Sequence, residues 1–89
     1  MAYRVELSPR GKRELDRVPS NAFRKVDAAV WGLRDHPRPT GCVKLKGPIY
    51  RIRVGRWRVI YAVFDTDQLV IVLKVVQRSE DTYKDLPGV

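Results

Sequence analysis

A run of alternating side chains on both sides of Gly55-Arg56 constrains the fold more than any other feature of this sequence. Residues 49–54 and 57–64 are rich in β-branched and aromatic residues, and a two-residue turn between two such runs is typical of a β-hairpin. Glycine readily adopts the positive φ that this turn requires. The sequence therefore predicts an antiparallel hairpin whose register is fixed by its turn.

The predicted register gives the hairpin two chemically different faces. Counting outward from the turn pairs Val54 with Trp57, Arg53 with Arg58, Ile52 with Val59, Arg51 with Ile60, and Tyr50 with Tyr61. One face is a core surface made of Tyr50, Ile52, Val54, Trp57, Val59 and Tyr61. We call the other face, which carries Arg51, Arg53 and Arg58, the arginine face.

The arginine face is difficult to explain as structure alone. Like charges directly opposite each other, as predicted for Arg53 and Arg58, destabilise an antiparallel pair, and neither pairing segment contains a carboxylate. An anion held between the strands would relieve the repulsion, and guanidinium groups match phosphate oxygens in a bidentate manner. The alternative is a basic edge that prevents aggregation, for which lysines on short strands are the usual device. We interpret the arginine face as a phosphate-binding surface.

The charge of the chain is concentrated around this hairpin. The net charge is +8, and residues 36–64 contain no aspartate or glutamate. The same stretch holds seven basic residues: Arg38, Lys44, Lys46, Arg51, Arg53, Arg56 and Arg58. Such segregation predicts a polyanionic partner, which can be nucleic acid, a membrane surface or an acidic protein.

Length and periodicity predict a single small α+β domain over residues 1–89, because a chain this short has room for one core. An N-terminal strand over 3–7 precedes a helix that starts at Ser8-Pro9 and stops at Pro19. A second helix, capped by Ser20 or Asn21, ends before Pro37. After a loop over 36–41, an antiparallel three- to four-strand meander is expected from a short extended piece over 43–45 and strands over 49–54, 57–64 and 69–76, followed by a short C-terminal helix over 79–86.

The second helix should pack its apolar stripe on the core. The stripe follows helical spacing and consists of Phe23, Val26, Val30 and Leu33, with Ala29 filling in. Trp31 lies off this stripe, and we expect it to cover the flank of the core.

Several kinds of site are not indicated. Cys42 is the only cysteine and His36 the only histidine, which excludes a disulfide framework and argues against a metal site. Asp65 and Asp67 fit turn chemistry. We expect no signal peptide, and the sequence contains no Gly-rich phosphate loop and no apolar run of the roughly 20 residues that cross a bilayer. We therefore expect a soluble cytoplasmic protein that uses no metal or cofactor.

Two further residues of interest follow the last predicted strand. With a plain turn over 65–68, alternation places Arg78 on the face opposite Arg58. A β-bulge would be needed to place Arg78 on the same face as Arg58. Tyr83 falls on the expected terminal helix, where packing is an alternative to a functional role.

Four segments carry a resemblance to a known family. They are Lys44-Leu45-Lys46-Gly47, Tyr50-Arg51-Ile52-Arg53-Val54-Gly55, Trp57-Arg58-Val59-Ile60-Tyr61, and Val76-Gln77-Arg78 ahead of Tyr83. In this combination the chain resembles the RelE/ParE superfamily of type II toxins over essentially its whole length. The resemblance implies a RelE-like microbial RNase fold.

The resemblance also implies a function. The RelE branch cuts mRNA in the ribosomal A site without a metal, whereas the ParE branch inhibits DNA gyrase. The basic residues of the RelE branch match Arg51, Arg53, Arg58 and Arg78, and its terminal aromatic residue matches Tyr83. The ParE branch typically lacks this full set, so the resemblance favours a ribosome-dependent endoribonuclease. A ParE-like gyrase inhibitor is the alternative, and a plain RNA-binding module is a third interpretation.

A role for each residue follows from the nuclease interpretation. Arg51 and Arg53 would hold the scissile phosphate, and Arg58 would stabilise charge on the phosphate oxygens in the transition state. Arg78 would assist Arg58 or neutralise the leaving 5′-oxygen. Tyr83 would orient the base or exchange a proton. Three basic residues would bind the backbone of ribosomal RNA: Lys44, Lys46 and Arg56.

The sequence departs from the best-known RelE pattern at Arg51 and Arg53, where lysines are frequent. Arginine stays charged and does not readily serve as an acid or base, which leaves proton transfer to Tyr83, or to water and the ribosome. The resemblance further implies an antitoxin, since a free toxin would harm its own cell. A surface of net charge +8 should attract a small, acidic, partly disordered antitoxin that folds on binding and forms a toxin–antitoxin hetero-oligomer.

Overall fold

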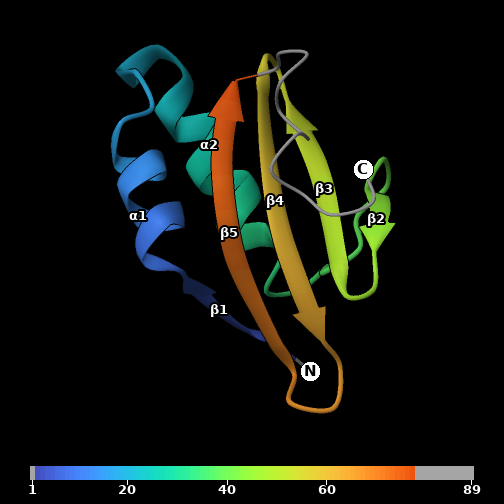
Figure 1. Ribbon diagram of the computed structural model, residues 1–89. Coiled ribbons are helices and arrows are strands. Elements are labelled where there is room, and N and C mark those ends of the chain that lie inside the picture. Colours follow the sequence, from blue (N-terminus) through green and yellow to red (C-terminus); the bar gives the residue numbers. More distant parts are fainter. Residues whose placement is uncertain (1, 78–89) are drawn as a thin grey trace.

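The structure, a computed structural model that describes residues 2–77, is a five-stranded sheet with two helices packed on one face (Figure 1). In chain order the elements are β1 (Arg4–Leu7), α1 (Pro9–Asp16), α2 (Ser20–Gly32), β2 (Val43–Lys46), β3 (Ile49–Val54), β4 (Trp57–Phe64) and β5 (Leu69–Gln77). These elements confirm the predicted α+β class. The terminal helix expected over 79–86 lies outside the described residues.

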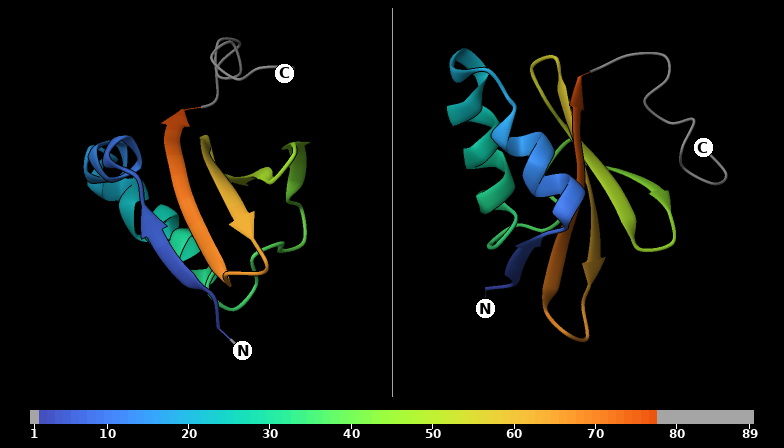
Figure 2. Two further views of the ribbon diagram at one scale, coloured as in Figure 1. Left: turned by 60° about the horizontal axis from the view of Figure 1, so that its bottom comes forward. Right: turned by 60° about the vertical axis from the view of Figure 1, so that its left-hand side comes forward.

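The sheet is mixed, with the strand order β1-β5-β4-β3-β2. Strands β2 to β5 form an antiparallel meander of four strands, at the upper end of the predicted range. Strand β1 joins the far edge of the meander and runs parallel to β5. The two helices connect β1 at one edge of the sheet to β2 at the other edge, and both lie on the same side of the sheet (Figure 2).

The two helices begin in different ways. Ser8 is the N-cap of α1, where its Oγ accepts a hydrogen bond of 3.0 Å from the Gly11 amide, and Pro9 is the first helical residue, as predicted. The prediction that Ser20 or Asn21 caps α2 was wrong. Ser20 is already the first helical residue, and Pro19 occupies the cap position without a side-chain hydrogen bond. The Pro19 carbonyl instead accepts from the amides of Ala22 and Phe23, both at 2.9 Å.

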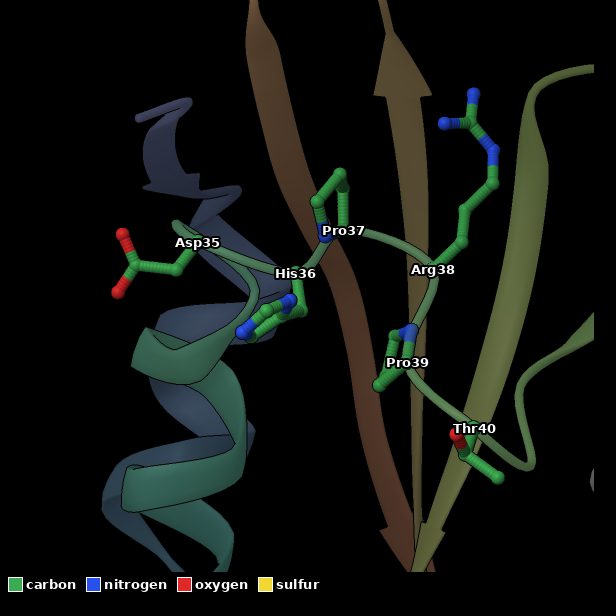
Figure 3. A pocket seen from close by; sticks show the side chains of 6 residues that line it. All are labelled: Asp35, His36, Pro37, Arg38, Pro39 and Thr40. Carbon is green, nitrogen blue, oxygen red and sulfur yellow. The ribbon is translucent and has the colours of Figure 1, made fainter. Parts of the chain in front are cut away.

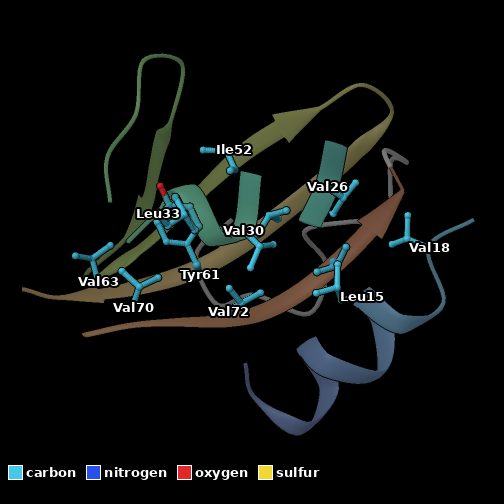
Figure 4. Close-up of a cluster of buried hydrophobic side chains, with 12 residues drawn as sticks. Leu15, Val18, Val26, Val30, Leu33, Ile52, Tyr61, Val63, Val70 and Val72 are labelled. Atoms are coloured by element: carbon cyan, nitrogen blue, oxygen red, sulfur yellow. The ribbon is translucent and has the colours of Figure 1, made fainter. Parts of the chain in front are cut away.

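The core lies between the helices and the sheet (Figure 4). The predicted α2 stripe is confirmed, because Val26, Val30 and Leu33 are each at most 1% exposed, and Phe23 and Ala29 pack against the same cluster. From α1 and the segment after it come Leu15 and Val18. The sheet supplies Ile52, Val59, Tyr61, Val63, Val70, Val72 and Val75.

Trp31 does not cover the flank of the core as expected. The side chain is 45% exposed, and its Nε1 donates a hydrogen bond of 2.9 Å to Asp27 Oδ1, one turn earlier on α2. Neighbouring positions on a helix differ in direction by about 100°, so the residue after buried Val30 already points toward solvent. In residues 2–77, no helix is both long enough and apolar enough to cross a bilayer.

Candidate nucleic-acid interface

The β3–β4 hairpin has the register that its turn predicts. Gly55 adopts a φ of +60°, and the five predicted pairs are all present, including Arg53 opposite Arg58. Cross-strand partners share a face of the sheet. The arginine face is therefore confirmed, and it lies opposite the face covered by α1 and α2 (Figure 2).

The arginine face extends over three strands because β5 pairs with β4. Residues from β3, β4 and β5 line up in three cross-strand rows: Ile49–Ala62–Ile71, Arg51–Ile60–Lys74, and Arg53–Arg58–Val76. The first row is apolar, and the other two contain four cations. One end of this face is thus neutral, and the other is strongly positive.

Solvent reaches these cations to different degrees. Arg53 is exposed and Arg51 is half-buried, whereas Arg58 is 5% exposed and Lys74 is 7% exposed. Buried cations are rare because removing a charge from water is costly. An anion that approached the exposed Arg53 guanidinium would also meet the field of two cations in a less polar environment, where electrostatic interactions are stronger than in water.

A β-bulge in β5 determines which residues reach the arginine face. The β4–β5 register shifts between Ile60 and Tyr61, which pair with Lys74 and Val72, so that Leu73 is the extra residue. From the sequence alone, Arg78 was predicted to share the face of Arg58 only if β5 contained such a bulge. Arg78 itself, like Tyr83, lies outside the described residues.

Sequence reasoning missed Lys74, although a signal was present. It is the only charged residue in β5. Without a bulge the register set at the turn would place Lys74 opposite Val59, which is fully buried in the core. That register would bury a charged lysine in the apolar core, which is unfavourable. A one-residue bulge avoids this by turning the Lys74 side chain to the other face.

The three lysine and arginine residues predicted to bind ribosomal RNA do not form one group. Lys46 pairs with Ile49 and therefore shares the arginine face, whereas Lys44 pairs with Tyr50 and belongs to the opposite face. Arg56 is exposed in the hairpin turn. Strands β2 and β3 lie at one edge of the sheet (Figure 1) and carry Lys44, Lys46, Arg51 and Arg53 on their two faces.

Asp65, predicted to serve only the turn, also binds two side chains from other parts of the chain. Its carboxylate accepts hydrogen bonds of 2.6 Å from both Arg38 Nη2 and the Tyr3 hydroxyl. The Arg38 guanidinium first, and the Tyr3 hydroxyl second, hold the pKa of Asp65 below its ordinary value. Arg38 also donates to the Tyr50 hydroxyl at 3.1 Å. These contacts tie the loop after α2 to the β4–β5 turn.

His36 takes no part in this network. Figure 3 shows Arg38 extending alongside the strands, away from His36 and Asp35 in the same loop. Among residues 2–77, no three histidine, cysteine or acidic side chains gather in a way that would hold a metal ion. Cys42 is half-buried against the core, in keeping with a small apolar role.

Comparison with known proteins identifies the family. Residues 5–82 match the family described as the ParE toxin of the type II toxin-antitoxin system parDE. The chain belongs to the RelE/ParE superfamily of type II toxins. It is 31% identical to a protein of Methanocaldococcus jannaschii with the provisional name toxin RelE1, over 96% of this chain and 99% of that relative.

Solved structures of toxins share the fold. A chain of the archaeal RelE–RelB complex from Pyrococcus horikoshii OT3 superposes with a TM-score of 0.76 and 28% identity, over 90% of this toxin and 99% of that chain. The isolated E. coli RelE toxin gives a TM-score of 0.74 with 24% identity, over 96% of each chain. The matched family carries the ParE name and these relatives carry the RelE name, so membership is shown at the level of the superfamily.

Proposed function

We propose that this toxin is a ribosome-dependent endoribonuclease that cleaves mRNA in the A site and so inhibits translation. The arrangement of Arg51, Arg53 and Arg58 on one sheet face, with two arginines directly opposed, is the observation that supports the proposal best. Opposed guanidinium groups are favourable when an anion joins them, and a phosphodiester presents oxygens in the geometry that they match. The similarity to proteins that carry the RelE name supports the RelE branch over the ParE branch in this proposal.

The proposed reaction is an internal attack within RNA. The 2′-oxygen forms a bond to the adjacent phosphorus while the bond from phosphorus to the 5′-oxygen breaks, which leaves a cyclic phosphate and a 5′-hydroxyl. The 2′-hydroxyl loses its proton and the leaving 5′-oxygen gains one, and the exchange falls to Tyr83, water or the ribosome because arginine stays charged. Arg51 and Arg53 hold the phosphate, and Arg58 stabilises the charge that develops on its oxygens.

An acidic antitoxin is the proposed protein partner. RelE is found in complex with RelB in the structure from P. horikoshii OT3. A toxin of net charge +8 offers such a partner a strongly complementary surface. We expect the complex to be a toxin–antitoxin hetero-oligomer formed in the cytoplasm.

The test is tightly controlled expression, followed by mapping of mRNA 5′ ends against ribosome positions. New ends within A-site codons are expected with the wild-type toxin. They should be strongly reduced with Arg53→Gln and unchanged with Lys25→Gln, which removes an exposed cation from α2 on the other side of the sheet. Growth arrest with intact mRNA would overturn the nuclease proposal.

Inhibition of DNA gyrase is the second candidate, because the matched family is described as the ParE toxin. In that case the same expression experiment should give a DNA-damage response and loss of supercoiling, with mRNA left intact. A purified-gyrase supercoiling assay separates the two functions directly. Harmless expression would instead favour a plain RNA-binding module.

A further inference from the structure

Lys74 occupies a central place on the arginine face that the nuclease interpretation does not use. It shares a cross-strand row with Ile60 and Arg51, and the next row holds Arg53 and Arg58. Neighbouring strands in a sheet are about 4.8 Å apart. Lys74 and Arg51 therefore stand roughly 10 Å apart at the backbone, with the apolar Ile60 between them.

The bulge that places Lys74 there is held by α1. Strand β1 ends opposite Val72, so the edge of β5 beyond that point has no neighbouring strand among the described residues. The first residues of the helix cover this edge instead. The Ser8 amide donates to the Val72 carbonyl at 2.9 Å, and Ser8 Oγ donates to the Leu73 carbonyl at 3.3 Å.

Glu14, near the other end of α1, also bonds to this edge of β5. Its Oε1 accepts a hydrogen bond of 3.0 Å from the Val75 amide, immediately after Lys74. Gly11 lets the helix come this close, because a Cβ atom there would stand 2.4 Å from the Val72 carbonyl oxygen. Backbone groups around the bulge thus bond to α1, and Val75 rather than Lys74 enters the core.

We propose that Lys74 is a further phosphate-binding residue of the arginine face, placed there by the bulge that α1 holds. The inference rests on the proposed function and narrows it. With Arg51, Arg53 and Arg58 around one phosphate, Lys74 contacts a neighbouring phosphate of the same strand. The ligand is a single-stranded RNA segment, and its backbone crosses the sheet from β3 to β5.

Binding of a short 2′-O-methyl RNA oligonucleotide, which lacks the attacking hydroxyl, tests the inference without cleavage. Dissociation constants are measured over a range of salt concentrations for the wild type, Lys74→Met, Lys74→Arg and the control Lys25→Met. Methionine keeps the apolar stem of a buried side chain and removes its charge. For single strands, each phosphate contact contributes about 0.7 to the slope of log affinity against log salt.

Lys74→Met should reduce that slope by about 0.7, whereas Lys74→Arg and Lys25→Met should keep the wild-type slope. Thermal unfolding of each variant checks that the fold is retained. If Lys74→Met is unstable, Lys74→Arg supplies the comparison, because arginine keeps the positive charge. Loss of affinity in a folded Lys74→Arg variant would contradict a charge contact. A wild-type slope in folded Lys74→Met overturns the inference alone. Absence of oligonucleotide binding by the wild type also overturns the inference, whereas the proposed function is overturned only by the mapping of mRNA 5′ ends.

Discussion

Arg53 and Arg58 face each other across the hairpin, but they differ as probes of function. Arg58 is almost fully buried, so its removal changes packing as well as charge, whereas Arg53 is exposed. We predict that Arg53→Gln leaves stability unchanged or raises it by up to about 1 kcal/mol, because a like-charge pair is relieved. Cleavage should fall by roughly 10²-fold or more through loss of a phosphate contact. Urea unfolding and a ribosome cleavage assay measure the two effects.

Val59→Ala is the matched change on the other face of the same hairpin. Val59 is fully buried in the core, and we expect a loss of roughly 1–3 kcal/mol in the free energy of unfolding. Its activity should follow the folded fraction. Phosphate should raise the melting temperature of Val59→Ala as much as that of wild type, and that of Arg53→Gln by less. A marked loss of stability in Arg53→Gln would show that the arginine is structural.

Asp65 gives a prediction for acid solution. Its pKa in the folded protein is lowered by the hydrogen bonds from Arg38 and Tyr3. A carboxyl group with a depressed folded pKa stabilises the protein above its unfolded pKa of about 3.9, and this contribution is lost as the pH falls through the folded pKa. Below about pH 4, wild type should therefore lose more stability than Asp65→Asn does. Urea midpoints measured from neutral pH downward would test this, and parallel curves for the two proteins would contradict it.

At the scale of elements, the contact of α1 with β5 predicts opposite effects for two glycines. Gly11→Ala would place a methyl group against the Val72 carbonyl, so we expect a loss of roughly 1–3 kcal/mol from overpacking. Gly32→Ala, at the end of α2, meets nothing within 4 Å. Alanine is the better helix former, and stability should rise by up to about 1 kcal/mol. Thermal unfolding of both variants measures the difference, and equal effects would show that the close approach is unimportant.

Glu14 tests whether α1 positions Lys74 or only packs. Glu14→Leu leaves the Val75 amide without its acceptor, at a cost of roughly 1–3 kcal/mol. Because the bulge is then less well held, we also expect weaker oligonucleotide binding in the folded protein. Glu14→Gln keeps a carbonyl oxygen at the same place and should restore most of the affinity. If Glu14→Leu is destabilised but binds RNA as wild type does, the helix has no positioning role.

The elements also show which parts of this fold can be predicted from sequence. The β3–β4 register was predictable because a two-residue turn fixes it, and the arginine face follows from that register. The sequence did not predict which residues of β5 point to which face of the sheet. The strand is apolar at nearly every position, so it has no alternation of polar and apolar residues that would distinguish the two faces. Around the bulge, Ser8 donates a hydrogen bond to Leu73 and Glu14 accepts one from Val75. Such contacts between elements distant in the chain leave no local pattern in the sequence. The parallel placement of β1 was likewise unpredicted for this reason.

At the scale of the whole molecule, the sheet separates the hydrophobic core from a cluster of positive charges. The helices and the sheet enclose the core on one side, while Arg51, Arg53, Arg58 and Lys74 gather on the other. The hydrophobic core and the cations thus occupy opposite faces of the sheet. A polyanion bound on that face would lower the electrostatic repulsion among these cations.

This charge distribution predicts how the proposed acidic antitoxin should associate with the toxin. A positive field speeds the encounter with a negative partner, up to about 10⁸–10⁹ M⁻¹s⁻¹ at low salt, against about 10⁵–10⁶ M⁻¹s⁻¹ for neutral surfaces. Raising the salt from 0.1 M to 1 M shortens the screening length from about 10 Å to about 3 Å. We expect the association rate constant to fall steeply over this range and the dissociation rate constant to change little, as measured by stopped-flow fluorescence. Arg53→Gln, which lowers the charge of the arginine face, should show a weaker salt dependence than Lys25→Gln, which lowers the net charge equally on the helical side. Equal salt dependence in the two variants would mean that the antitoxin responds to net charge and does not approach the arginine face.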